Sequence, residues 1–101
     1  MNNKIQILAI IPARSGSKGL KNKNIKFLNG HPLLAYSIKA GLSSNNIDRV
    51  ICSTDSKKIR DIARDYGADV PFIRPKKFAT DQSRDFSFIN HTLEWLRDNE
   101  N

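Results

Sequence analysis

Three short apolar runs, separated by segments with helical spacing, constrain the fold of this chain more than any other feature. The runs are residues 5–12, 50–53 and 70–73. A nearly continuous apolar run is typical of a strand that is covered on both faces. The order strand–helix–strand–helix–strand–helix therefore predicts an α/β fold, a Rossmann-like parallel sheet with helices on both faces. With three strands and three helices, this sheet is incomplete.

The boundaries of the first two helices follow from turn and cap residues. Asn29-Gly30 indicates a turn, and Pro32 suits the first turn of a helix. Asp55 or Ser56 caps the second helix, and Gly67 is placed as its C-terminal cap. The apolar stripes predicted for these helices are Leu34, Ile38, Gly41 and Leu42 in the first and Ile59, Ile62, Ala63 and Tyr66 in the second.

The third helix, from about residue 84 to 98, has two apolar stripes. One is Phe86, Ile89, Leu93 and Leu96, and the other is Phe88, Thr92 and Trp95. A helix that closes a finished domain usually has polar residues on its second face. We therefore interpret residues 1–101 as the N-terminal, nucleotide-binding half of a longer domain, or as a half that needs a partner. The alternative is a slightly apolar terminal helix.

The positive charge of the chain is concentrated near its start. The formal net charge is +7, and no acidic residue precedes Asp48. Five of the seven bases in that stretch lie between positions 14 and 26: Arg14, Lys18, Lys21, Lys23 and Lys26. A focused basic loop after a strand favours a small anion such as a nucleotide phosphate, whereas a diffuse basic surface would indicate nucleic acid. A solvated basic loop is the alternative.

The residue types in this loop suit phosphate binding. Gly16 and Gly19 allow close backbone approach to a ligand, and Arg14 can hold a phosphate through two hydrogen bonds. The G-x-x-x-x-G-K-[ST] and G-x-G-x-x-G patterns are both absent. Asp55 and Arg74 follow the second and third runs, so they are expected at the same sheet edge, where such folds bind ligands. Asp55 could face a nucleotide or a metal, but a helix cap is the favoured interpretation.

The length of the apolar runs and the single cysteine indicate the cellular compartment. No apolar run reaches the ~20 residues of a membrane span. The single cysteine, Cys52, lies in an apolar run and is expected in the core, as in a reducing compartment. We therefore expect a cytoplasmic protein without a membrane partner.

Several segments together resemble one known family, the acylneuraminate cytidylyltransferases (CMP-sialic acid synthetases). The match begins with Ile11-Pro12-Ala13-Arg14-x-Gly16-Ser17-Lys18-Gly19-Leu20 and Lys23-Asn24. It continues through residues 30–38, Ser53-Thr54-Asp55, Tyr66-Gly67-Ala68, Arg74-Pro75 and Thr80-Asp81. The resemblance covers nearly the whole chain, but only about the first half of a typical family member.

The resemblance implies a nucleotidyltransferase that joins CTP to an acidic nine-carbon sugar, with Mg²⁺, to give a CMP-sugar and pyrophosphate. It implies catalytic roles for Lys18, which also contacts the triphosphate, and for Lys23 near the reacting phosphate. The implied CTP contacts are Ala13, Arg14, Ser17, Gly19, Asn24, Arg74 and Ser83. Gly19 favours a substrate of sialic or legionaminic acid type.

The second half of the family's sequence, with its Mg²⁺ ligands and most of its sugar pocket, is not in this chain. We therefore expect no metal site in this chain and no activity from it alone, and a homodimer or a complementing C-terminal half as partner. The alternatives are a non-catalytic nucleotide- or anion-binding module and, less favoured, a nucleic-acid-binding domain.

Overall fold

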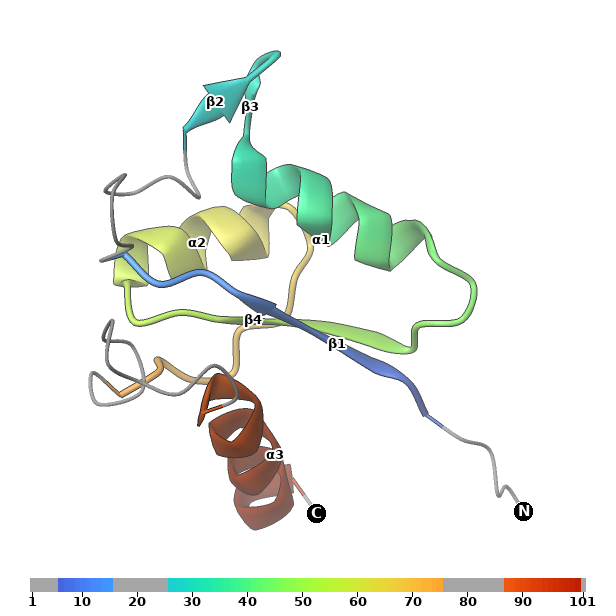
Figure 1. The fold of residues 1–101 in the computed structure, drawn as a ribbon, viewed down its shortest axis with the longest axis vertical. Helices are drawn as coiled ribbons and strands as arrows, with labels where there is room; N and C mark the ends of the chain where they lie inside the picture. Colours follow the sequence, from blue (N-terminus) through green and yellow to red (C-terminus); the bar gives the residue numbers. More distant parts are fainter. Residues whose placement is uncertain (1–5, 16–25, 76–86, 101) are drawn as a thin grey trace.

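The computed structural model describes residues 6–15, 26–75 and 87–100. A two-stranded sheet is surrounded by three helices and a short hairpin (Figure 1). The elements in chain order are β1 (Leu8–Pro12), β2 (Phe27–Leu28), β3 (His31–Pro32), α1 (Leu33–Ser43), β4 (Arg49–Ser53), α2 (Lys57–Asp65) and α3 (Ser87–Glu100).

The central pair of strands is parallel, as the element order predicts. β1 pairs with β4 from Leu8↔Arg49 to Pro12↔Ser53, so the carboxyl ends of both strands lie together. Helices α1 and α2 lie on one side of this pair and α3 lies on the other (Figure 1). The predicted α/β class, with helices on both faces of a parallel sheet, is confirmed.

The third predicted strand is wrong in extent. Instead of a strand over residues 70–73, the chain makes one isolated parallel bridge, Ile51↔Asp69. The Asp69 N–H donates to the Val50 carbonyl (2.9 Å), and the Asp69 carbonyl accepts from Cys52 N–H (3.0 Å). The next ladder bond would need an N–H from residue 71, which is a proline, so the ladder stops there.

The hairpin confirms the predicted turn but adds two short strands that were not predicted. Asn29 and Gly30 both have positive φ, 53° and 86°. Positive φ at both central residues defines a type I′ turn, which matches the twist of paired strands and favours Asn-Gly. β2 and β3 pair antiparallel across it. Pro32, expected inside the first helical turn, is the N-cap of α1.

The hydrogen bond at the start of α2 shows which of the two predicted residues, Asp55 or Ser56, is its N-cap. The Ser56 hydroxyl accepts a hydrogen bond from Ile59 N–H (3.1 Å), so Ser56 is the N-cap. The favoured interpretation of Asp55 as the cap is therefore wrong. Gly67 follows the helix with φ of 100°, and its N–H donates to the Arg64 carbonyl (3.0 Å), as expected for a C-terminal glycine.

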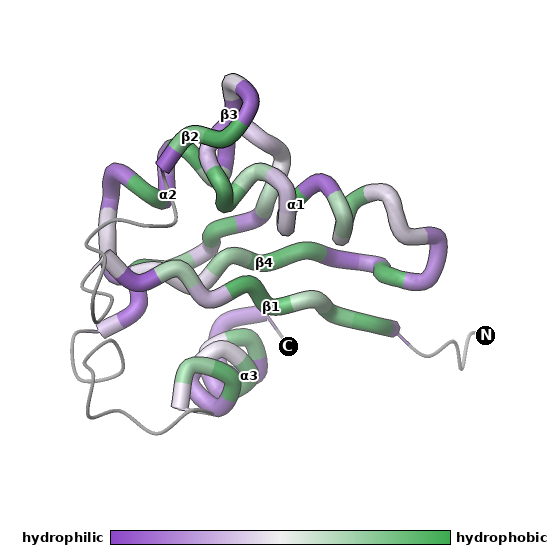
Figure 2. Tube along the Cα trace, turned by 45° about the horizontal axis from the view of Figure 1, so that its top comes forward, coloured by the Kyte–Doolittle hydropathy of each residue, from purple (hydrophilic) through white to green (hydrophobic). Residues whose placement is uncertain are grey.

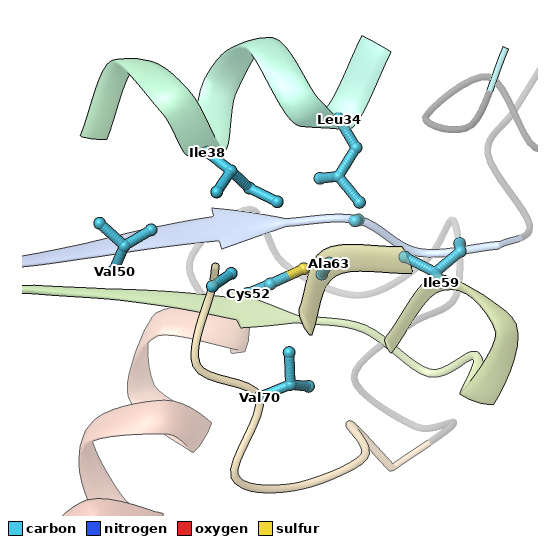
Figure 3. Close-up of a cluster of buried hydrophobic side chains, with 9 residues drawn as sticks. Leu34, Ile38, Val50, Cys52, Ile59, Ala63 and Val70 are labelled. Carbon is cyan, nitrogen blue, oxygen red and sulfur yellow. The ribbon is translucent and has the colours of Figure 1, made fainter. Parts of the chain in front are cut away.

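One hydrophobic core joins α1, α2 and the strands. Leu34 and Ile38 point from α1 toward the strands, and Ile59 and Ala63 come from α2 (Figure 3). The predicted stripe of α1 is correct except for Leu42, which is 52% exposed. Cys52 is fully buried, as expected. The tube coloured by hydropathy shows the apolar stretches of β1 and β4 between the helices (Figure 2).

The third helix packs through the second of its two predicted stripes, which is Phe88, Thr92 and Trp95. Thr92 is fully buried, and the Trp95 ring lies 5.2 Å from the Phe72 ring. Leu93, from the other stripe, is 50% exposed. The expected start near residue 84, and Phe86, lie outside the described residues.

The end of α3 is tied to the start of β4. The Arg49 guanidinium donates to the carboxylates of Asp69 (2.8 Å from Nε) and Glu100 (2.6 Å from Nη1). The hydrogen bond to Glu100 is the main reason that the pKa of Arg49 is raised.

Among the described residues, no helix is long and apolar enough to cross a membrane.

Candidate functional site at the strand ends

The candidate site begins where β1 and β4 end. Ala13, directly after β1, is fully buried, and its N–H donates to the Ser53 carbonyl (2.9 Å). This bond continues the parallel pairing by one residue beyond β1. It fixes the backbone from which Arg14 and Ser15 leave the sheet.

The first functional contact between the two strand ends is a carboxylate clamp. The Ser15 N–H donates to Asp55 Oδ1 (2.8 Å), and the Ser15 hydroxyl donates to Asp55 Oδ2 (3.0 Å). Both carboxylate oxygens of Asp55 therefore hold one residue of the opposite strand end. Asp55 is positioned by the turn that precedes α2, where the Ser56 N–H donates to Thr54 Oγ1 (3.1 Å).

Arg74 reaches the same strand ends from the segment that follows the bridge. Its backbone N–H donates to the Thr54 carbonyl (2.7 Å), which brings residue 74 alongside the end of β4. Its side chain is buried, with Nε donating to Ser53 Oγ (2.9 Å) and Nη2 donating to the Ser53 carbonyl (2.6 Å). The guanidinium carbon lies 5.5 Å from the centre of the Phe88 ring, so α3 covers it with an aromatic face.

The charges at the strand ends influence one another. Burial lowers the pKa of the Arg74 guanidinium, the Asp55 carboxylate opposes this shift, and the Arg14 guanidinium adds to it. Three charged groups from three separate segments are therefore within electrostatic reach. Their sum, two guanidiniums and one carboxylate, leaves a net positive charge at the sheet edge.

The structure thus brings together three of the predicted site residues: Ala13, Arg14 and Arg74. The other predicted site residues lie outside the described part of the chain: Ser17, Lys18, Gly19, Lys23, Asn24 and Ser83. Their predicted roles stay predictions. Within residues 6–15, 26–75 and 87–100, no group of three or more His, Cys, Asp or Glu side chains could hold a metal ion.

Sequence reasoning missed two parts of this arrangement. It did not predict the pairing of Ser15 with Asp55, and it gave Phe88 only as part of an apolar stripe, not as a ring over Arg74. Ser53-Thr54-Asp55 at a strand end was the available signal for the first. The second depends on the path of α3, which no local pattern gives.

A second feature lies among β3, α1 and the end of α2. A small cavity of about 190 Å³ is lined by His31, Ala35, Tyr36, Lys39 and Tyr66. His31 Nδ1 and the Tyr66 hydroxyl lie 3.0 Å apart, at hydrogen-bonding distance. None of the predicted nucleotide contacts lines this cavity.

Comparisons with known proteins show which family the chain matches. The cytidylyltransferase family model matches residues 8–94. The chain is 52% identical over 95 residues to the N-acylneuraminate cytidylyltransferase of Escherichia coli O18:K1:H7, covering 94% of this chain and 22% of that protein. It is 51% identical over 79 residues to the CMP-N,N'-diacetyllegionaminic acid synthase of Legionella pneumophila, covering 78% of this chain and 34% of that protein.

The fold is also found among solved structures. CMP:2-keto-3-deoxy-manno-octonic acid synthetase, solved in complex with CTP, superposes with a TM-score of 0.74 at 20% identity, over 95% of this chain and 36% of that one. The chain spans 22% and 34% of the lengths of the two curated relatives. Because the family match covers most of the residues, including both ends of the parallel strand pair, this chain belongs to the cytidylyltransferase family.

Proposed function

We propose that this chain is the nucleotide-binding part of an enzyme that joins CTP to an acidic nine-carbon sugar of sialic or legionaminic acid type. In that reaction a sugar hydroxyl oxygen bonds to the α-phosphorus of CTP and loses its proton. The bond from that phosphorus to pyrophosphate breaks. The names of the two relatives support the substrate class. Residues 1–101 are proposed to serve as the N-terminal, CTP-binding half.

The observation that carries the proposal is the cluster of Arg14 and Arg74 at the carboxyl ends of two parallel strands. Ligands of open α/β sheets bind at this edge. The net positive charge there suits a triphosphate. Lys18 and Lys23 follow within ten residues of Arg14 in sequence. We propose them as the cations that neutralise charge on the reacting phosphates.

Magnesium is part of the proposal, but its ligands are not assigned to this chain. The described residues offer no cluster that fits a metal ion, as stated above. When bound, Mg²⁺ would supply charge neutralisation on the phosphates. The residues of this chain would bind and orient CTP.

A second polypeptide surface is proposed to complete the site, either a complementing C-terminal half or a second copy. The β1 residues from Leu8 to Ile11 are all apolar but only half-buried. Within the described strands, β1 pairs only with β4, which leaves its other edge open. Leu93 is half exposed on α3. We propose a cytoplasmic setting, consistent with the buried free thiol of Cys52.

The test is calorimetric titration of the chain with CTP, with Arg14→Ala as the variant and Arg97→Ala as its matched control. Both variants lose one arginine, but Arg97 is exposed on α3, near the end that contacts Arg49 at the start of β4. We expect Arg14→Ala to weaken CTP binding about tenfold, the effect of losing one charge-assisted phosphate contact, and Arg97→Ala to leave it unchanged. Equal losses in both would show that only bulk charge matters.

A matched lysine pair extends the same test to the basic loop. Lys18→Ala is expected to weaken binding far more than Lys39→Ala, because Lys39 is exposed on α1. A third arm titrates short duplex DNA. Tight DNA binding with a steep salt dependence, and no binding of CTP, would replace the proposed function with nucleic-acid binding.

A further inference from the structure

We propose that Asp55 is a positioning residue for nucleotide binding: its carboxylate holds Ser15 and thereby fixes Arg14 at the strand ends, beside Arg74. This inference rests on the proposed function, because it assigns a role in CTP binding to a residue that carries the wrong charge to contact phosphate.

The first step is the completeness of the clamp. Asp55 uses both carboxylate oxygens on one residue, taking the Ser15 N–H at 2.8 Å and the Ser15 hydroxyl at 3.0 Å. Two bonds to one residue fix both its backbone orientation and its side-chain torsion. Ser15 directly follows Arg14, and the Ala13 N–H is itself held by the Ser53 carbonyl. Arg14 is therefore the one residue between two fixed points.

The second step is charge. The Arg74 guanidinium is only 3% exposed, and Arg14 lies close enough to disfavour its charge further. Two guanidiniums in one place repel each other unless a carboxylate is nearby. Asp55 is the carboxylate whose attraction opposes the burial of Arg74. Its negative charge offsets part of the repulsion between the two guanidiniums before any anion arrives.

If Asp55 positions Arg14, removing Asp55 changes the CTP affinity in the opposite direction to the change that bulk electrostatics predicts. A carboxylate beside an anion site repels the anion, so removing its charge strengthens anion binding if charge alone matters. If Asp55 positions Arg14, removing it weakens binding. The sign of the change in CTP affinity therefore separates the two roles.

The experiment compares Asp55→Asn with Asp61→Asn by titration with CTP at fixed salt. Both variants lose one negative charge and keep the side-chain size, but Asp61 is exposed on α2 and pairs only with its neighbour Arg60 among the ion pairs of the described residues. The Asn amide nitrogen cannot accept the Ser15 hydroxyl hydrogen bond, and a neutral amide forms weaker hydrogen bonds than a carboxylate. We expect Asp55→Asn to bind CTP about tenfold more weakly, the scale of one hydrogen bond to a charged group. Asp61→Asn should bind unchanged or slightly tighter.

A ligand-free readout tests the clamp itself. Amide hydrogen exchange measured by NMR is expected to accelerate about tenfold at Ser15 in Asp55→Ala, because its N–H loses its acceptor, and to stay unchanged there in Asp61→Asn. If Asp55→Ala does not fold, judged by circular dichroism, Asp55→Asn and Ser15→Ala carry the test. Ser15→Ala removes only the hydroxyl bond and should weaken CTP binding less than Asp55→Asn.

The outcomes separate the inference from the function on which it rests. A wild-type chain that binds no CTP overturns the proposed function, and Ser15 exchange then still decides whether the clamp exists. A wild-type chain that binds CTP, with equal or tighter binding in Asp55→Asn, overturns only the positioning role. Unchanged exchange at Ser15 in Asp55→Ala overturns the clamp in either case.

Discussion

Replacing Arg74 with methionine tests whether the buried guanidinium raises or lowers the free energy of unfolding. Methionine keeps an unbranched apolar stem that reaches about as far as Nε, but it removes the guanidinium with its charge, its donors and its contact with Phe88. Arg74 is 3% exposed, so solvent cannot replace the lost hydrogen bonds. The variant therefore measures what the guanidinium as a whole contributes to the free energy of unfolding.

The expected magnitude follows from opposing contributions. Two charge-assisted hydrogen bonds to Ser53 are lost, each worth about 1.5–3 kcal/mol, and so is the cation–π contact, worth about 0.5–2 kcal/mol. Against this loss, removing a buried charge recovers several kcal/mol of desolvation. The Ser53 carbonyl keeps its bond from Ala13 N–H, whereas the Ser53 hydroxyl loses the Arg74 donor. We expect a net destabilisation of about 2 kcal/mol.

Urea unfolding followed by the fluorescence of Trp95, the single tryptophan, measures this change. With a slope of about 1.5 kcal/mol per molar urea, the midpoint should fall by about 1.3 M. Arg60→Met is the matched control, because Arg60 pairs with its neighbour Asp61 near the surface and should change stability by less than about 0.5 kcal/mol. An Arg74→Met midpoint equal to or above that of the wild type would refute the reasoning.

Three further predictions concern the scaffold. Burial raises the pKa of the Cys52 thiol from 9.0 to about 11. The contribution of Cys52 to stability should therefore be constant below about pH 8 and fall by up to about 2–3 kcal/mol toward pH 11, where the unfolded chain loses a proton that the folded chain keeps; urea unfolding of Cys52→Ala should lack this part of the fall. Ser56→Ala should lose about 1 kcal/mol of stability in thermal unfolding, whereas Ser37→Ala, exposed within α1, should not; equal effects would contradict the cap. Gly41→Ala should destabilise despite its better helix propensity, because its Cβ would lie 2.9 Å from Val50 Cγ2; Val50→Ala should relieve that clash, and a stabilised single variant would disprove it.

The sequence predicts most of this fold because its local patterns and its tertiary packing agree. The apolar runs predicted over residues 5–12 and 50–53 contain β1 (Leu8–Pro12) and most of β4 (Arg49–Ser53), and Gly67 lies just after α2 as expected. The predicted third strand is reduced to a single bridge at Asp69, because Pro71 has no N–H for the next hydrogen bond. The apolar pattern alone does not show this. An apolar sequence pattern predicts which residues are buried. The length of a strand also depends on whether each residue has a backbone N–H to donate.

The candidate site was predicted less completely, and for a different reason. The positions of Arg14 and Arg74 at one sheet edge follow from parallel topology. The role of Asp55 does not, because an aspartate before a helix fits a cap equally well, and only the path of the chain shows that Ser56 takes that place. The choice of stripe on α3 also depends on tertiary packing, since both stripes of that helix are apolar.

The most direct test of the account is an NMR titration of the isotope-labelled chain with CTP, following the amide signals. The account predicts that the signals of Ala13, Ser15 and Arg74, at the strand ends, move together and saturate with one affinity. The signals of His31 and Tyr66, at the cavity between β3 and the end of α2, should stay in place. Saturable shifts confined to His31 and Tyr66, with the strand-end signals unmoved, would contradict the central claim.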